Sequence, residues 1–204
     1  MNTVLFSAAV EGATDEAILH RIVKIAGGSL GTVYGRNGKD FLRRKINGFN
    51  HAARFSPWIV LVDLNTEAEC APALLTSWIP NLAENMCLRI TVHKIESWLL
   101  ADKINFSDFL KVPPARLPQF PDMESDPKKI LVNVASRSRS KSIRQDICPQ
   151  PESGRKVGPA YTSRLIDFIT TAWQPSEAIE YSPSLRSCID AITKIVRKFN
   201  KNYK

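Results

Sequence analysis

The chain has 204 residues with 44% hydrophobic and 24% charged side chains, an ordinary balance for a globular protein that buries a core, and a net charge of +8. It has no run of eighteen apolar residues and no basic start to its apolar N-terminus, so the sequence predicts neither a membrane span nor a signal peptide, and we expect a cytoplasmic protein. Its four cysteines lie too far apart in sequence for a disulfide framework or a zinc site, and we expect reduced thiols.

The first half of the chain alternates short apolar runs with segments of helical periodicity. The expected elements are a strand at 3–10, a helix at 14–26, a weak strand at 29–34, a helix at 40–53, a strand at 58–62, a helix at 70–79, a strand at 88–92 and a helix at 95–101. Repeated strand–helix units of this length predict an α/β fold with an open, mostly parallel four-stranded sheet flanked by helices. Ligands of such sheets bind beyond the carboxyl ends of the strands.

The pattern changes after Asp102. Residues 112–127 contain five prolines, which is typical of a linker or an irregular loop, and helices are expected near 127–136, 160–172 and 184–199. We therefore expect an α/β core at 1–111 and a basic, helical C-terminal region at 112–204 that packs on the core.

Acidic residues follow three of the expected strands. Glu11 follows the first, Asp63 the third and Glu96 the fourth, while Asp15 lies one helical turn beyond Glu11. Parallel strands bring these positions to one edge of the sheet, and clustered carboxylates are ligands for Mg²⁺. Asp15, Asp63 and Glu96 also have ordinary structural explanations, as a first-turn helix acid, a turn residue and an exposed helix residue respectively.

Three segments resemble the successive motifs of TOPRIM-like proteins: residues 10–16 (VEGATDE), 61–65 (LVDLN) and 95–102 (IESWLLAD). The chain is most similar to small stand-alone members of unknown function, and it also resembles the nuclease domain of the OLD family (overcoming lysogenization defect). Residues 126–129 (DPKK) and 158–161 (GPAY) resemble the same small family, so the likeness covers nearly the whole chain.

The resemblance implies a Mg²⁺- or Mn²⁺-dependent nuclease with a TOPRIM-like fold. The roles it implies are a ligand or general acid–base at Glu11, a second ligand at Asp15, the first residue of a DxD pair at Asp63, a late ligand at Glu96, and a lysine that stabilises the pentavalent phosphate at Lys128 or Lys129. Relatives of this kind often work beside an ABC-type ATPase in antiviral defence, which implies such a partner and a toxic activity.

Two positions depart from the pattern. Asn65 stands where the DxD pair has its second carboxylate, so its carbonyl oxygen is the remaining ligand there, and Lys94 stands where OLD-type enzymes have a small hydroxyl residue. A single-metal site, weaker catalysis and a non-catalytic scaffold that binds an ATPase or nucleic acid all remain open. A primase-like nucleotidyl transferase is a third class, and DNA and RNA remain alternative substrates.

Positive charge is concentrated in the second half of the chain. Residues 1–126 contain 13 basic and 14 acidic side chains, whereas residues 127–204 contain 15 and 6, which indicates a surface for a polyanion. The expected phosphate contacts are Arg36 and Lys39 in a glycine-bearing loop, and Arg137, Arg139, Lys141 and Arg144 in the densest basic stretch. The alternatives are an Asn-Gly turn for the first group and a solvated flexible loop for the second.

Overall fold

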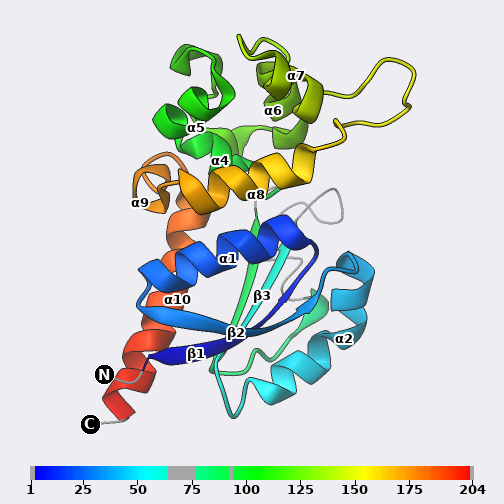
Figure 1. Ribbon diagram of the computed structural model, residues 1–204. Coiled ribbons are helices and arrows are strands. Elements are labelled where there is room, and N and C mark those ends of the chain that lie inside the picture. The colour runs from blue at the N-terminus through cyan, green and yellow to red at the C-terminus, as the bar shows by residue number, and fades with distance from the viewer. Residues whose placement is uncertain (1–2, 64–76, 92–93, 203–204) are drawn as a thin grey trace. The chain divides into compact units, whose positions relative to one another are not determined.

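The structure is a computed structural model that describes residues 3–63, 77–91 and 94–202 (Figure 1). The chain forms two compact units, one made of Met1–Val92 with Ser184–Lys204 and the other of His93–Pro183. We call them the sheet unit and the helical unit. The two units meet in the sequence at residues 92/93 and 183/184, whereas the expected domain boundary lay after residue 111. The expected boundary stays a prediction.

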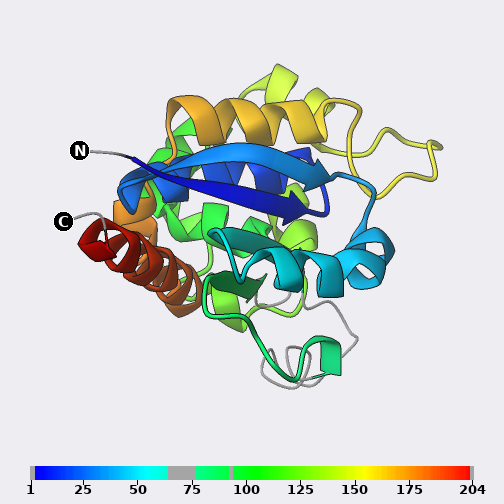
Figure 2. The ribbon, with the colours of Figure 1, turned by 90° about the horizontal axis from the view of Figure 1, so that it is seen from below.

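The sheet unit contains four strands, all parallel, in the order β2-β1-β3-β4. The strands are β1 (Val4–Val10), β2 (Gly28–Gly35), β3 (Trp58–Asp63) and β4 (Met86–Thr91). In Figure 2, β1 and β2 lie side by side with their arrowheads at the same end. This confirms the predicted α/β fold with an open, parallel four-stranded sheet flanked by helices. Strand β4 starts two residues before the predicted one because Met86 already pairs with Trp58.

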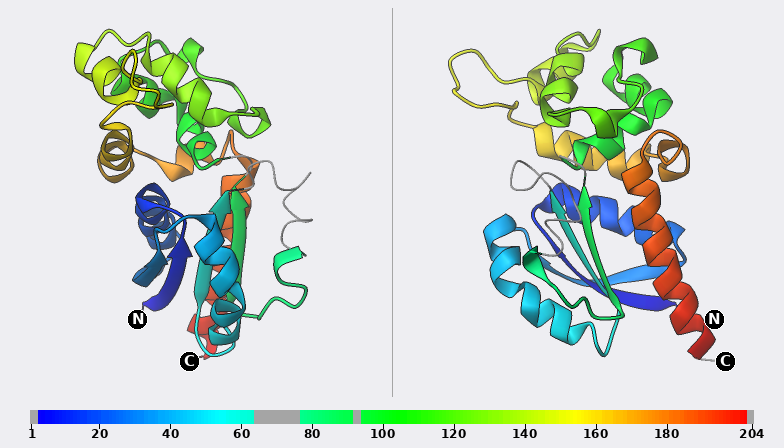
Figure 3. Two further views of the ribbon diagram at one scale, coloured as in Figure 1. Left: turned by 90° about the vertical axis from the view of Figure 1, so that its right-hand side faces the viewer. Right: turned by 180° about the vertical axis from the view of Figure 1, so that it is seen from behind.

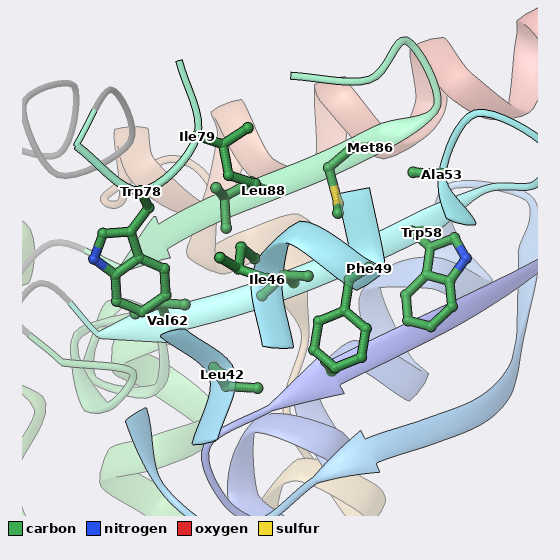
Figure 4. Packing of buried hydrophobic residues seen from close by; sticks show 12 residues of the cluster. Leu42, Ile46, Phe49, Ala53, Trp58, Val62, Trp78, Ile79, Met86 and Leu88 are labelled. Atoms are coloured by element: carbon green, nitrogen blue, oxygen red, sulfur yellow. The ribbon is translucent and has the colours of Figure 1, made fainter. Parts of the chain in front are cut away.

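Helices α1 (Ala13–Ile25) and α2 (Lys39–Ala52) cover opposite faces of the sheet (Figure 3). The α2 face is a cluster of aromatic and aliphatic side chains in which Leu42, Ile46 and Phe49 pack against alternate residues of β3 and β4 (Figure 4). The other side chains of β3 face the opposite side, so this strand is buried on both faces. That explains its unbroken apolar sequence.

The C-terminal helix α10 (Pro183–Asn202) belongs to the sheet unit from Ser184 onward. Its apolar face, which includes Leu185, Ile192 and Val196, is buried. Lys198 Nζ lies 2.7 Å from a carboxylate oxygen of Glu84 and donates to Asn85 Oδ1 at 2.7 Å. The basic C-terminal stretch is therefore part of a regular helix as far as Asn202.

The described residues of the helical unit form no strand (Figure 3). Its elements are α4 (Glu96–Ala101), α5 (Lys103–Leu110), the 3₁₀ turns η1 (Pro114–Arg116) and η2 (Pro121–Met123), α6 (Pro127–Ala135), α7 (Lys141–Ile147), α8 (Tyr161–Thr171) and α9 (Pro175–Ala178). Trp98, Phe106 and Phe168 are fully buried in this unit. The proline-rich stretch forms ordered turns because three of its prolines occupy first-turn positions, where a missing N–H costs no hydrogen bond.

Two of the cysteines lie together in the sheet unit. Cys87 of β4 and Cys188 of α10 are buried free thiols whose interaction lowers the pKa of Cys87, while the same interaction and burial raise the pKa of Cys188. Cys148 is a half-buried free thiol, and Cys70 lies outside the described residues. Within the described part of the chain, no helix combines the length and apolar character that a bilayer span requires.

Candidate functional site

Two of the predicted acids meet at the carboxyl edge of the sheet. Glu11 directly follows β1, and Asp63 is the last residue of β3. The backbone N–H of Asp63 donates to Glu11 Oε1 at 2.8 Å, although the two residues are 52 positions apart in the sequence. The cause is the parallel pairing of β1 with β3, which ends both strands at the same edge.

The Asp63 carboxylate is held by a residue that the sequence reasoning missed. Thr91, the last residue of β4, is paired with Asp63 in the strand register. Its fully buried hydroxyl donates to Asp63 Oδ1 at 2.6 Å. A polar residue at the end of a mostly apolar strand was the available signal. Because the threonine restricts this carboxylate, Asp63 has a defined orientation at the edge.

Asp15 also lies near this edge, in the first turn of α1. It is 8% exposed, and its Oδ2 accepts the backbone N–H of Gly12 at 2.8 Å. This contact caps the N-terminus of α1. One oxygen of Asp15 therefore has the structural role expected of a first-turn helix acid. A role as a second metal ligand stays a prediction.

Lys39 reaches the same edge from the first position of α2. Its Nζ donates to the backbone carbonyl oxygen of Asp63 at 2.8 Å and lies 5.9 Å from the ring centre of Trp78. The loop before it is closed onto the end of β1, because the N–H of Gly38 donates to the carbonyl of Glu11 at 3.2 Å. The predicted phosphate-binding lysine thus stands beside the acidic pair.

Arg36, the other predicted phosphate contact of this loop, is engaged elsewhere. Its guanidinium donates to both carboxylate oxygens of Glu16, at 2.5 and 2.6 Å. This hydrogen-bonded ion pair raises the pKa of the arginine. The structure therefore sets Arg36 against Glu16, on an exposed surface where such a pair adds little stability.

The donor atoms at this edge fit a hard divalent ion. No three His, Cys, Asp or Glu side chains gather for a metal ion among the residues described here. Mg²⁺, however, is commonly bound by only one or two protein carboxylates and completes its shell with water and substrate phosphate oxygens. Glu11 and Asp63 supply two such carboxylates, while Asn65, a predicted ligand, lies outside the described residues.

Glu96, the fourth predicted ligand, begins α4 in the helical unit and is 3% exposed. The hydroxyl of Tyr161 donates to its Oε1 at 2.9 Å, and Lys128 Nζ lies 3.3 Å from the same oxygen. Lys128 also lies 5.6 Å from the ring centre of Tyr161. Three separate motif segments thus meet at one buried carboxylate. Because Glu96 and Glu11 belong to different units, a site shared by them stays a prediction.

The structure distinguishes the two lysines that the sequence left as alternatives. Lys128 contacts the Glu96 carboxylate, whereas the side chain of Lys129 is exposed and its backbone N–H caps the helix through Asp126 Oδ1 at 3.3 Å. Position 128 is therefore the one that contacts the Glu96 carboxylate.

Lys94, which departs from the OLD pattern, forms an ion pair with Asp126 at 2.7 Å. Burial alone would raise the pKa of the Asp126 carboxyl, but the hydrogen bonds from Lys94 and the Lys129 backbone N–H, together with the charges of Lys94 and Lys128, lower it below its ordinary value. A depressed pKa stabilises the fold above the ordinary pKa of the carboxyl, and this contribution is lost as the pH falls through the folded-state value.

Replacement of Lys94 by methionine is expected to raise the pKa of Asp126, because the strongest of its charged partners is removed. NMR titration of the aspartate carboxyl carbons measures this pKa directly. Lys129→Met is the matched control, since Lys129 contacts Asp126 through its backbone N–H, which the substitution leaves in place. An equal pKa in both variants would show that Lys94 does not hold the carboxylate.

The densest basic stretch is folded, contrary to the flexible-loop alternative. Ser140 caps α7 through the N–H of Ile143 at 3.4 Å, and the guanidinium of Arg144 donates to the carbonyl of Ser138. The remaining predicted phosphate contacts of the stretch, Arg137, Arg139 and Lys141, have exposed side chains. Arg137 lines a surface hollow of about 640 Å³ together with Arg116, and Arg139 lines one of about 530 Å³ with Lys111.

No family model, no curated protein and no solved structure matches the chain.

Proposed function

We propose that the protein is a Mg²⁺- or Mn²⁺-dependent nuclease of the TOPRIM type that hydrolyses nucleic-acid phosphodiesters. The observation that carries the proposal is the hydrogen bond of 2.8 Å from the Asp63 N–H to Glu11 Oε1. It places two acids from distant segments at the carboxyl edge of a parallel sheet, where ligands of open α/β sheets bind. The motif resemblance assigns metal-dependent cleavage to these same two acids.

In this proposal, Glu11 and Asp63 hold the divalent ion, which would activate water and stabilise the leaving oxygen of the phosphodiester. Thr91 keeps the Asp63 carboxylate in one orientation, and Glu11 and Asp63 are both half-buried. Glu96 and Lys128 are assigned their ligand and phosphate-stabilising roles from the resemblance alone.

The basic side chains of the helical unit are the proposed nucleic-acid contacts. Exposed arginines and lysines bind backbone phosphates without reading sequence, so we propose that Arg137, Arg139 and Lys141 position the strand. An ABC-type ATPase partner, an antiviral role and a cytoplasmic location belong to the same proposal and rest on the resemblance.

A non-catalytic scaffold is the second candidate, and one contact favours it. The buried Glu96 carboxylate already accepts a hydrogen bond from Tyr161 and faces the Lys128 ammonium, as expected of a structural ion pair. The neutral Asn65 points the same way, because it removes a carboxylate from the DxD position. A scaffold would bind a partner or a nucleic acid without cleaving it.

Incubation of the purified chain with labelled DNA and RNA separates the two candidates. We expect cleavage in Mg²⁺ or Mn²⁺ that EDTA abolishes and that added metal restores, because the acidic pair needs a cation to act on a phosphodiester. Binding without cleavage in either metal would support the scaffold. Cleavage that persists in EDTA would overturn the metal-dependent proposal.

A further inference from the structure

We infer that Lys39 is a built-in cation of the proposed metal site, whose ammonium takes the place of a second divalent ion so that the site binds one. The inference rests on the proposed function, because it concerns the same carboxyl edge. It goes further than the proposed function in stating how many divalent ions the site binds and which residue determines that number.

The position of the ammonium is the first argument. Lys39 Nζ is 2.8 Å from the carbonyl oxygen of Asp63, and Glu11 Oε1 is 2.8 Å from the amide nitrogen of the same residue. Both contacts are made to the backbone of one residue, which spans only a few ångströms, about the length of one Cα–Cα step. The lysine charge and the acidic pair therefore share one small region.

The surroundings hold Lys39 there rather than in bulk solvent. The side chain is half-buried, and its Nζ lies 5.9 Å from the ring centre of the buried Trp78. Lys39 is also the first residue of α2, where a positive charge is disfavoured by the helix dipole. The negative charge of Glu11 and Asp63 at the adjacent edge offsets that cost, so the acids stabilise the lysine in this position.

Formal charge gives the number of ions. Glu11 and Asp63 carry two negative charges and Lys39 carries one positive charge, which leaves −1. One divalent ion brings the net charge to +1, whereas a second would bring it to +3 in a half-buried region, where uncompensated charge is costly.

Mn²⁺ binding to the full-length chain tests the inference without an activity assay. Calorimetry and electron paramagnetic resonance of free Mn²⁺ measure stoichiometry and affinity for the wild type, Lys39→Met, Lys39→Arg and Lys45→Met. Lys45 is an exposed lysine of the same helix, so its substitution removes the same charge away from the edge. Methionine retains an aliphatic side chain beside Trp78, and circular dichroism verifies that the variants are folded.

We expect one Mn²⁺ per wild-type chain. Lys39→Met should bind it about tenfold tighter, because a neighbouring like charge is removed, while Lys39→Arg and Lys45→Met should match the wild type. Two ions in the wild type, or equal affinity in Lys39→Met and Lys45→Met, would overturn the inference and leave the proposed nuclease standing. A wild type that binds no Mn²⁺ would instead overturn the proposed metal site, and the role of Lys39 with it.

Discussion

Glu11→Gln is expected to lower the rate of metal-dependent cleavage about 10²- to 10⁴-fold, the usual effect of removing a group that acts as ligand or general acid–base. The substitution removes the charge but keeps the shape. Glutamine retains an oxygen that can accept the Asp63 N–H, so the hydrogen bond of 2.8 Å between the strand ends can persist. The loss should therefore arise from chemistry and not from unfolding.

Single-turnover cleavage with saturating protein measures this rate, and thermal unfolding verifies the fold. Glu84→Gln is the matched control. Glu84 carries out no proposed step, lies just before β4 at the opposite edge of the sheet, and has an exposed carboxylate paired with Lys198. We expect Glu84→Gln to cleave at the wild-type rate. Equal cleavage by wild type and Glu11→Gln would sink the assignment of Glu11 and point to a contaminating nuclease.

Gly35→Ala is expected to cause the largest loss of folding free energy, about 3 kcal/mol or more from backbone strain and steric overlap together. Gly35 ends β2 with φ at +99°, and an added Cβ would lie 2.3 Å from the carbonyl oxygen of Val10. That oxygen also accepts the N–H of Arg36 at 2.9 Å. Because Val10 is the last residue of β1, any shift that relieves the overlap also displaces Glu11.

Gly38→Ala is the control that separates the cost of backbone strain from the cost of steric overlap. Gly38 has φ at +75° and ψ at 179°, a conformation that also disfavours alanine, but an added Cβ would meet no atom within 4 Å. We expect this control to lose about 1–3 kcal/mol. Urea denaturation of both variants measures the two free energies of unfolding. An equal loss in the two variants would show that a Cβ at position 35 does not overlap with the carbonyl oxygen of Val10.

The fold class could be predicted because its signals are local. The unbroken apolar run before Asp63 predicts a strand covered on both faces, and β3 is such a strand. The helical periodicity over 14–26 and the glycines at 27 and 28 predict α1 to within a residue at either end. Strand β4 was predicted two residues late because its first pairings, with β3, are not visible in its own composition.

The meeting of Glu11 with Asp63 also followed from the sequence, since parallel strands that end in acids bring those acids to one edge. Three hydrogen bonds of the candidate sites did not follow from the sequence. They are those from Thr91 to the Asp63 carboxylate, from Lys39 to the Asp63 carbonyl, and from Tyr161 to Glu96. Each joins residues at least 24 positions apart through side chains whose direction depends on packing.

The sequence by itself therefore determined the alternation of strands and helices, the parallel sheet and the acids at its carboxyl edge, because periodicity and strand ends are properties of neighbouring residues. Only the tertiary structure decided which cations stand beside those acids and which stand elsewhere. Lys39 joins Asp63, Lys128 joins Glu96, and Arg36 pairs with Glu16. The physical reason is that a long charged side chain can satisfy its charge with any acid within reach, and the backbone fold alone sets which acid that is.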